Sequence, residues 1–426
     1  MVSLIIIIFL LGYAAIVFEE QIKINKTASA LVTGVLCWTV YMLGSNNVEL
    51  VDSQLIHHFA DASQILFFLM GAMTIVEVMD AHDAFDVLIS KLRTRKKVVL
   101  LWIIGFVAFF FSAVLDNLTT TIVMVSFLRK LIYNREDRLF MASIIIIAAN
   151  AGGAFSPIGD VTTTMLWIGG QVTTGKLIEY VFLPSLVCLV APLAYLSTKM
   201  KGSFQEISDP SVSDEKLSVS QKQKTIIFFL GISALLFVPV FKTFTHLPPF
   251  MGMLLSLGVM WIVTEIIHAK KDEEEKHPFT ASHALEKIDT PSILFFAGIL
   301  LAVGTLQTTG VLTDIALWLS NVFGSESAIA IIIGVVSAIV DNVPLVAAAM
   351  GMYSLEQFPQ DHLFWHFIAY CAGTGGSLLI IGSAAGVAAM GMEKIEFFWY
   401  LKRITGIAAL GYFAGCAAFI LEHYAF

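Results

Sequence analysis

The chain has 426 residues, of which 57% are hydrophobic and only 14% are charged. A soluble domain carries about 25% charged residues, so this composition excludes a water-soluble globular protein. The formal net charge of -8 predicts no partner, because the orientation of a membrane protein follows its lysines and arginines and hardly depends on its acids.

Apolar runs long enough to span a bilayer recur along the whole chain. Examples are residues 4–18, 31–43, 98–111, 180–195, 226–240 and 404–421. The runs are continuous and show no polar/apolar alternation, so they predict transmembrane helices and not barrel strands. The first run lacks a basic flank and a small-residue cleavage site, and we expect it to be retained as a helix. The cysteines show no C-x-x-C spacing and predict neither a metal cage nor a disulfide framework.

The basic residues predict an orientation. When the polar loops are placed alternately inside and outside, every lysine and arginine except Lys176 and Lys242 falls on one side. The positive-inside rule then predicts a multi-pass protein of the plasma membrane, a bacterial inner membrane, with its N-terminus outside. Two polar segments rich in charge, residues 199–224 and 269–289, are expected to be cytoplasmic linkers.

Two related motifs place an acid in apolar surroundings. "SAVLDNLTT" covers residues 112–120, and "SAIVDNVPL" covers residues 337–345. Lysines and arginines flank the first motif, whereas the loops around the second contain none, so hairpins with tips near Asp116 and Asp341 are expected to open to opposite sides. Downstream, "AGGAFSPIG" and "TGGSLLIIG" share a Gly-Gly pair and a final Gly in register. This order predicts an all-α polytopic membrane protein of two inverted-topology repeats, each with a re-entrant hairpin and a discontinuous transmembrane helix.

The landmarks divide the chain into six parts. They are N-terminal scaffold helices (1–63), repeat 1 (64–198, hairpin tip near 116, broken helix 150–164), a cytoplasmic linker (199–224), connecting helices (225–268), a second linker (269–289) and repeat 2 (290–426, hairpin tip near 341, broken helix 372–386).

Three carboxylates fall at the predicted breaks and tips: Asp116, Asp160 and Asp341. Acids within membrane segments are costly and usually functional. The polar residues around them supply amide and hydroxyl oxygens without sulfur or imidazole, a set that suits a hard cation. A proton competes for the same carboxylates. Isolated hydroxyls are less specific, because serine and threonine in helices often bond their own backbone. His82, near the cytoplasmic end of the third helix, is expected to be exposed.

Three longer stretches, "SAVLDNLTTTIVMV", "NAGGAFSPIGDVTTTMLW" and "SAIVDNVPLVAAAMGM", resemble the NhaD-type sodium/proton antiporters of the ion transporter superfamily. The three stretches occur in the same order as in that family, and the resemblance covers nearly the whole chain. It implies a transport domain held by a dimerising scaffold, and exchange of cytoplasmic Na⁺ (or Li⁺) for external H⁺ at buried carboxylates, with a role in pH homeostasis.

The resemblance also implies a set of ion-handling residues. They are Asp116, Asn117, Asn150, Asp160, Thr162, Thr163, Asp341 and Asn342, with Ser112 and Ser337 nearby. We assign Asp116 and Asp341 as the shared Na⁺/H⁺ carboxylates, and Asn117 and Asn342 as neutral Na⁺ ligands. The second broken helix offers Ser383 where the first has Asp160, and Ser383 completes the set of expected ion-binding residues.

Two alternatives remain. A Na⁺-coupled di- or tricarboxylate symporter of the same superfamily keeps the architecture and changes the cargo. The two Asp-Asn tips and the lack of an obvious intramembrane lysine or arginine favour the antiporter, but the aspartates could also serve sodium in a symporter. An intramembrane aspartyl protease is disfavoured, because Pro157 and Leu115 depart from its motifs. We therefore expect no enzymatic activity, no cofactor and no nucleic-acid partner.

Overall fold

The computed structural model describes residues 1–89, 94, 96–204 and 219–423, and over these residues the chain is helical without a β-strand. Nine helices of this described part are long and apolar enough to cross a membrane. The number is ten if α16 (Val311–Phe323) and α17 (Glu326–Val336), which meet at 113°, form one span. The protein is therefore an all-α polytopic membrane protein, as the sequence predicts.

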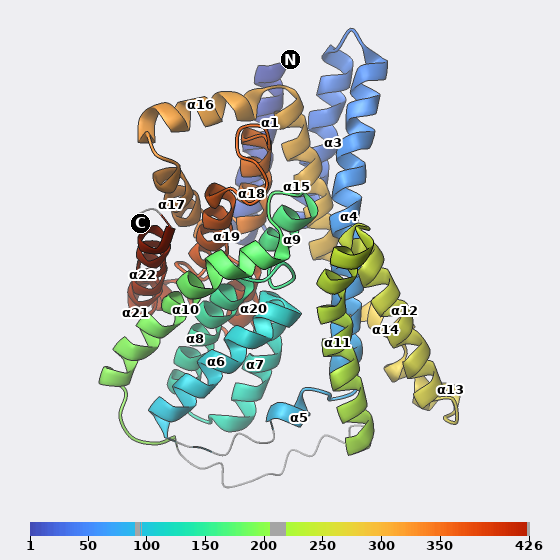
Figure 1. Ribbon diagram of the computed structural model, residues 1–426, viewed down its shortest axis with the longest axis vertical. Coiled ribbons are helices and arrows are strands. Elements are labelled where there is room, and N and C mark those ends of the chain that lie inside the picture. Colours follow the sequence, from blue (N-terminus) through green and yellow to red (C-terminus); the bar gives the residue numbers. More distant parts are fainter. Residues whose placement is uncertain (90–93, 95, 205–218, 424–426) are drawn as a thin grey trace.

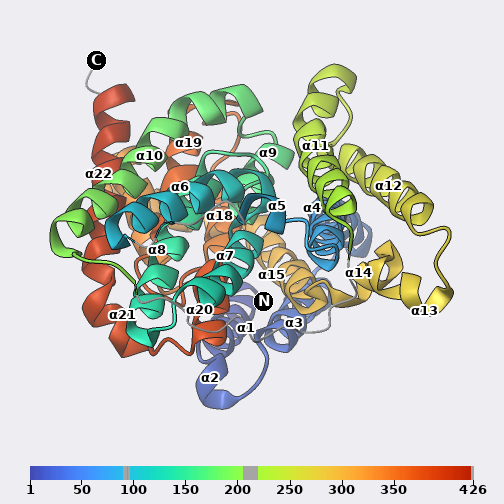
Figure 2. The same cartoon turned by 90° about the horizontal axis from the view of Figure 1, so that it is seen from below.

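One set of helices, here called the flanking group, packs around the long helix α4 and, through α1, on its neighbour α3. Seen from below, α11 and α12 lie to one side of the molecule (Figure 2). Helices α3 and α15 are held together by two hydrogen bonds, from Trp38 Nε1 to the Leu301 carbonyl (2.8 Å) and from Thr27 Oγ1 to the Pro291 carbonyl (2.9 Å). The flanking group comprises α1 (Val2–Val17), α2 (Glu19–Ile22), α3 (Lys26–Gly44), α4 (Val48–Ala81), α11 (Gln221–Thr245), α12 (Pro249–Ile267) and α15 (Thr290–Thr308).

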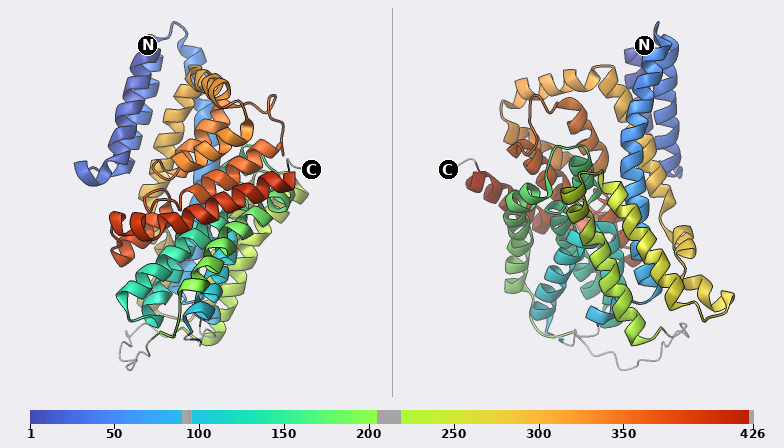
Figure 3. Two further views of the ribbon diagram at one scale, coloured as in Figure 1. Left: turned by 90° about the vertical axis from the view of Figure 1, so that its left-hand side faces the viewer. Right: turned by 45° about the vertical axis from the view of Figure 1, so that its right-hand side comes forward.

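A second set of helices forms a central group that contains the predicted breaks. Helices α6 and α7 meet at Asp116 and rise from below in Figure 1, whereas α17 and α18 meet near Asp341 and descend from above (Figures 1 and 3). The central group comprises α6 (Lys97–Leu115), α7 (Asn117–Leu131), α8 (Arg135–Ala154), α9 (Val161–Ile168), α10 (Thr174–Lys199), α17, α18 (Asn342–Met352), α19 (Leu363–Gly375), α20 (Ala384–Glu393), α21 (Phe397–Arg403) and α22 (Thr405–His423).

Two interruptions between helices fall within the predicted breaks, and that each pair of helices forms one discontinuous transmembrane helix stays a prediction. Helix α8 stops at Ala154 and α9 starts at Val161, inside the predicted break 150–164. Helix α19 stops at Gly375 and α20 starts at Ala384, inside the predicted break 372–386. Glycines and a proline explain these breaks, because both residue types disfavour a continuous helix.

Glycines bring each broken helix into backbone contact with its hairpin. A Cβ at Gly152 would overlap the Phe109 carbonyl on α6, and a Cβ at Gly375 would overlap the Gly334 carbonyl on α17. Gly152 and Gly375 hold corresponding positions in the two Gly-Gly motifs. The shared contact supports the predicted repeat, whose inverted symmetry stays a prediction.

A buried carboxylate ties three helix ends together on the side predicted to be cytoplasmic. Glu393, at the end of α20, accepts from Arg129 Nε on α7 and Arg138 Nε on α8, each at 2.7 Å. Of the two predicted linkers, most of residues 199–224 lies outside the described residues. The second, residues 269–289, contains the short helices α13 (Glu273–Lys276), η1 (His277–Phe279) and α14 (Ala281–Lys287), and α5 (Asp86–Ile89) follows α4.

The expectation that His82 is exposed is wrong. Its ring is fully buried, with Nε2 at 2.9 Å from Nε2 of His268, and both rings lie against Phe279. Burial lowers the pKa of His82 and lowers that of His268 to about 4, so both rings are neutral at physiological pH. The sequence could not show that Phe279 of the second linker folds back over these helix ends.

Replacing Gly152 with alanine should destabilise the protein by about 2 kcal/mol, because the new methyl group meets backbone that cannot move aside. Thermal unfolding of the detergent-solubilised protein measures this. Gly258→Ala on α12 is the control, because no atom lies within 4 Å of a Cβ there. Equal unfolding temperatures for the two variants would contradict the close approach.

Candidate functional site

Four helices begin in the interior of the central group, and each begins at a side chain that caps it. The first amide groups of a helix have no partner within the helix and need an outside acceptor. The caps are Asp116 for α7, Asp160 for α9, Asp341 for α18 and Ser383 for α20. Four of the predicted site residues therefore share one structural role.

Asp160 is the carboxylate on which the hairpin tips converge. It is 2% exposed. Its Oδ2 accepts from Asn117 Nδ2 at 2.7 Å and from Asn342 Nδ2 at 3.3 Å, so one amide arrives from each tip. Its Oδ1 accepts from the backbone N of Thr162 at 2.9 Å and from Thr162 Oγ1 at 3.0 Å. We call Asp160, Asn117, Asn342, Thr162 and Asn150 the polar centre.

Asn150 connects the polar centre to the second broken helix. Its side chain is fully buried, and its Oδ1 accepts from Asn117 Nδ2 at 3.0 Å. Its Nδ2 donates to the hydroxyls of Ser377 and Ser383, each at 2.9 Å. The polar centre therefore joins residues from both hairpins and both broken helices.

Three predicted hydroxyl residues bond backbone carbonyls and do not contact the carboxylate of Asp160. Ser112 donates to the Ala149 carbonyl. Ser337 donates to the Gly334 carbonyl at 2.7 Å, and Thr163 to the Asp160 carbonyl at 2.9 Å. These hydroxyls position helices, a common role for serine and threonine in helices.

The two tip aspartates differ in conformation and in partners. Asp116 has φ 86° and ψ 162°, a region that favours glycine, and both of its carboxylate oxygens bind Thr119, through its backbone N (2.7 Å) and its Oγ1 (2.9 Å). Asp341 has an ordinary φ of -45°, and its Oδ2 lies 3.5 Å from Nζ of Lys26.

Lys26 is the residue that the sequence analysis missed. The absence of an intramembrane lysine was an argument for the antiporter, but Lys26 reaches a hairpin tip. Its position in a short polar turn made it look like an ordinary cytoplasmic loop charge. Asn25, which caps α3 through the backbone N of Thr27, was the signal that Lys26 is the first residue of a helix.

Two cavities lie along α4, between the flanking and central groups. The first, of about 650 Å³, is lined by part of residues 53–65 of α4 and by Ala347 of α18. The second, of about 470 Å³, is lined by part of residues 73–80 of α4, Thr119 of α7 and Ala384 of α20. The second cavity therefore reaches residues next to two of the helix caps.

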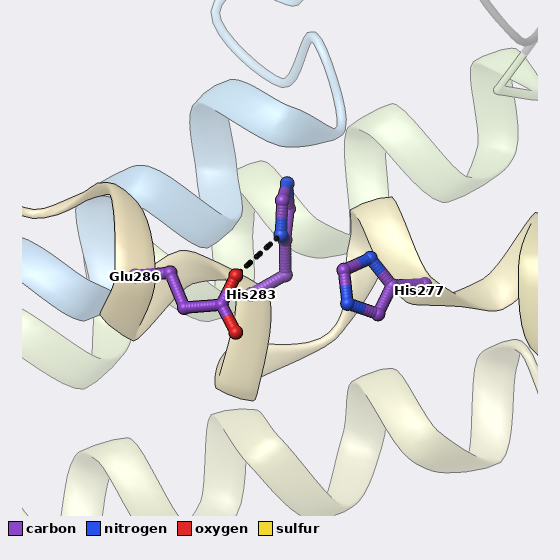
Figure 4. A group of neighbouring side chains, drawn as sticks. All are labelled: His277, His283 and Glu286. Atoms are coloured by element: carbon purple, nitrogen blue, oxygen red, sulfur yellow. Dashed lines mark hydrogen bonds and ion pairs between the residues drawn. The ribbon is translucent and has the colours of Figure 1, made fainter.

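Metal-ligating side chains also meet in the second linker, next to Lys287, which lines the second cavity. His277, His283 and Glu286 lie side by side, with His283 Nδ1 at 3.3 Å from Glu286 Oε2 (Figure 4). His277 and Glu286 are exposed, and the polar centre contains neither histidine nor cysteine. The side chains of the centre thus offer only oxygen to a metal cation.

The fold and the site together define the class of membrane protein to which the chain belongs. Discontinuous helices around buried polar groups in the middle of a bundle are the architecture of secondary transporters. The family model described as "Citrate transporter" (CitMHS) matches residues 13–373 of the chain.

Three named relatives match nearly the whole chain. Sodium/proton antiporter 1 of Arabidopsis thaliana is 51% identical over 419 residues, covering 98% of this chain and 72% of the relative. Sodium/proton antiporter 2 of the same plant is 49% identical, covering 98% of this chain and 99% of the relative. The Na(+)/H(+) antiporter NhaD of Vibrio cholerae is 32% identical, covering 99% of this chain and 92% of the relative.

The chain therefore belongs to the CitMHS family, and the predicted membership among the NhaD-type proteins is confirmed. It is a multi-pass membrane transporter and not an enzyme.

Asp116→Gly should raise the unfolding temperature above that of the wild type. Glycine relieves a backbone strain of about 1–3 kcal/mol and costs only a few tenths of a kcal/mol as a helix cap. Asp116→Ala keeps the strain and loses the cap, so it should unfold below the wild type. A glycine variant less stable than the alanine variant would show that the backbone of Asp116 is not strained.

Proposed function

We propose that the protein exchanges cytoplasmic Na⁺ (or Li⁺) for external H⁺ by competition at the polar centre. The main observation behind this proposal is the buried carboxylate of Asp160, which accepts hydrogen bonds from an amide at each hairpin tip. A buried carboxylate is costly unless a cation or a proton neutralises it. The names of the relatives, sodium/proton antiporters in a plant and in a bacterium, support the same cargo.

The ligands proposed for Na⁺ are the Asp160 carboxylate and the amides of Asn117 and Asn342. Each amide now donates its nitrogen to Asp160, and half a turn of the amide would present its oxygen instead. Na⁺ is a hard cation that prefers oxygen ligands. Asp116 and Asp341 are further Na⁺/H⁺ carboxylates, and Ser383 and Asn150 connect the second broken helix to the centre.

The exchange requires access from each side in turn. The two cavities along α4 support this, because both lie between the flanking and central groups. In the proposed cycle, the central group carries the ion past a flanking group that forms the homodimer scaffold. The positive-inside distribution of lysine and arginine favours an outside N-terminus, and in the proposed orientation Na⁺ leaves as H⁺ enters and the protein serves pH homeostasis.

A Na⁺-coupled citrate or other carboxylate symporter is the second candidate, prompted by the family description. The centre argues against it. Three aspartates cap helices within the central group, and a di- or tricarboxylate there would meet like charge.

Proton flux in proteoliposomes with a pH-sensitive dye tests the proposal. After a proton gradient is imposed, NaCl or LiCl should dissipate it in the wild type. Asp160→Asn should reduce the response to that of empty liposomes, because the central charge is lost. Asp116→Asn and Asp341→Asn should raise the half-saturating Na⁺ concentration by about tenfold, the factor that one lost ion contact of ~1.4 kcal/mol produces.

Asp52→Asn is the matched control, because Asp52 is an exposed aspartate of α4 outside the centre. It should behave as the wild type. A folded wild type that gives no Na⁺ or Li⁺ response would overturn the exchange proposal. Uptake of labelled citrate driven by a Na⁺ gradient in the same liposomes would then establish the symporter.

A further inference from the structure

Lys26 and Asp341 form an ion pair across the boundary between the flanking and central groups. Lys26 Nζ lies 3.5 Å from Asp341 Oδ2, and the two side chains are 26% and 16% exposed. Lys26 begins α3 of the flanking group, whereas Asp341 caps α18 at a hairpin tip of the central group. The pair therefore joins two parts that the exchange cycle moves past each other.

The sequence of the second hairpin explains why Asp341 needs an outside partner. Three positions after Asp116, Thr119 offers a backbone N–H and a hydroxyl that together bind both carboxylate oxygens. Three positions after Asp341 stands Pro344, which has neither group. Only Oδ1 of Asp341 receives a cap bond, from the backbone N of Val343 at 3.2 Å, and Oδ2 faces Lys26.

Contacts within the flanking group hold Lys26 in place. Its Nζ lies 4.7 Å from the centre of the Phe295 ring on α15, a cation–π contact. Its backbone N donates to Glu19 Oε1 at 3.0 Å. The neighbouring Thr27 binds the Pro291 carbonyl and so fixes the start of α3 to the start of α15.

The hairpin tip connects this pair directly to the polar centre. Asn342, the residue after Asp341, donates to Asp160 at 3.3 Å. Lys26 also lines the cavity of about 470 Å³ that reaches Thr119 and Ala384. A charge change at Asp341 is therefore one residue away from the proposed ion ligands.

We propose that Lys26 is a positioning residue that stands in for the transported cation at Asp341. The ammonium holds the hairpin tip to α3 while Asp341 carries no cargo. A Na⁺ ion at Asp341 replaces the ammonium and releases the tip, which frees the central group to move. This inference rests on the proposed exchange, because release by cargo has a meaning only if the tip carries Na⁺.

Other charged and titratable groups surround the pair. Tyr13 of α1 and Asp160 lie within electrostatic range of Asp341. The cavity that Lys26 lines also contains Glu19, Glu77, Asp80, Lys287 and Asp289. Among the lysines of the described residues, Lys26 alone forms an ion pair with a hairpin-tip aspartate, so the test is directed at this residue.

Na⁺-dependent proton flux in proteoliposomes tests the proposal, because variants of the two partners should change the half-saturating Na⁺ concentration in opposite directions. At alkaline pH, Lys26→Gln should lower the half-saturating Na⁺ concentration by about tenfold, because a built-in competitor is gone. Asp341→Asn should raise it. Lys26→Arg should keep the Na⁺ dependence of the wild type.

Lys23→Gln is the matched control, because Lys23 is an exposed lysine three residues earlier in the chain. It should leave the Na⁺ dependence unchanged. A Lys26→Gln variant that only loses maximal rate, with an unchanged half-saturating Na⁺ concentration, would overturn the proposal.

Thermal unfolding in detergent provides a second measurement that does not depend on transport. Each single variant, Lys26→Gln or Asp341→Asn, leaves one charge without its counter-charge, whereas the double variant leaves none. The double variant should therefore unfold at or above the temperature of either single variant. Additive destabilisation would overturn the ion pair. A wild type without Na⁺-dependent flux but with this coupling would instead contradict only the proposed exchange.

Discussion

Helices that begin in the interior of a membrane protein leave backbone N–H groups without partners, and this constraint shapes the centre of the molecule. Helices α7, α9, α18 and α20 begin in this way, and each is capped by the side chain of the residue that precedes it. Three of the four caps are aspartates. A carboxylate suits this place, because its negative charge faces the positive end of the helix dipole. The residues that suggest ion chemistry are thus also needed to form the fold.

Helix capping alone does not explain why three of the four capping residues are charged. Ser383 caps α20 at the position that corresponds to Asp160, and it does so as a neutral hydroxyl. The aspartates therefore bring negative charge beyond what the helix ends require, and buried charge needs a partner. Lys26 supplies one for Asp341. Asp116 keeps its carboxylate in a backbone conformation that favours glycine, as expected where function outweighs local stability. We propose transported cations and protons as the partners of the remaining charge.

Patterns within single segments were predictable from the sequence, whereas contacts between distant segments were not. Glycine, proline and aspartate in apolar runs gave both breaks, because they interrupt a helix wherever they occur. The convergence of Asn117 and Asn342 on Asp160 depends on how two hairpins dock, which the sequence does not show. Lys26 looked like a loop charge because its partner lies 315 positions away in the chain. His82 looked exposed for a similar reason, since His268 and Phe279 cover it.

The most direct test of the central claim, that Na⁺ and H⁺ compete for the same buried carboxylates, is the pH dependence of Na⁺ binding to the purified protein. Isothermal titration calorimetry over a range of about pH 5 to 9 measures it without any transport step. Competition with one proton predicts that the dissociation constant rises about tenfold for each unit of pH decrease at the acidic end and is constant at the alkaline end. A dissociation constant that stays the same across this range would contradict the account.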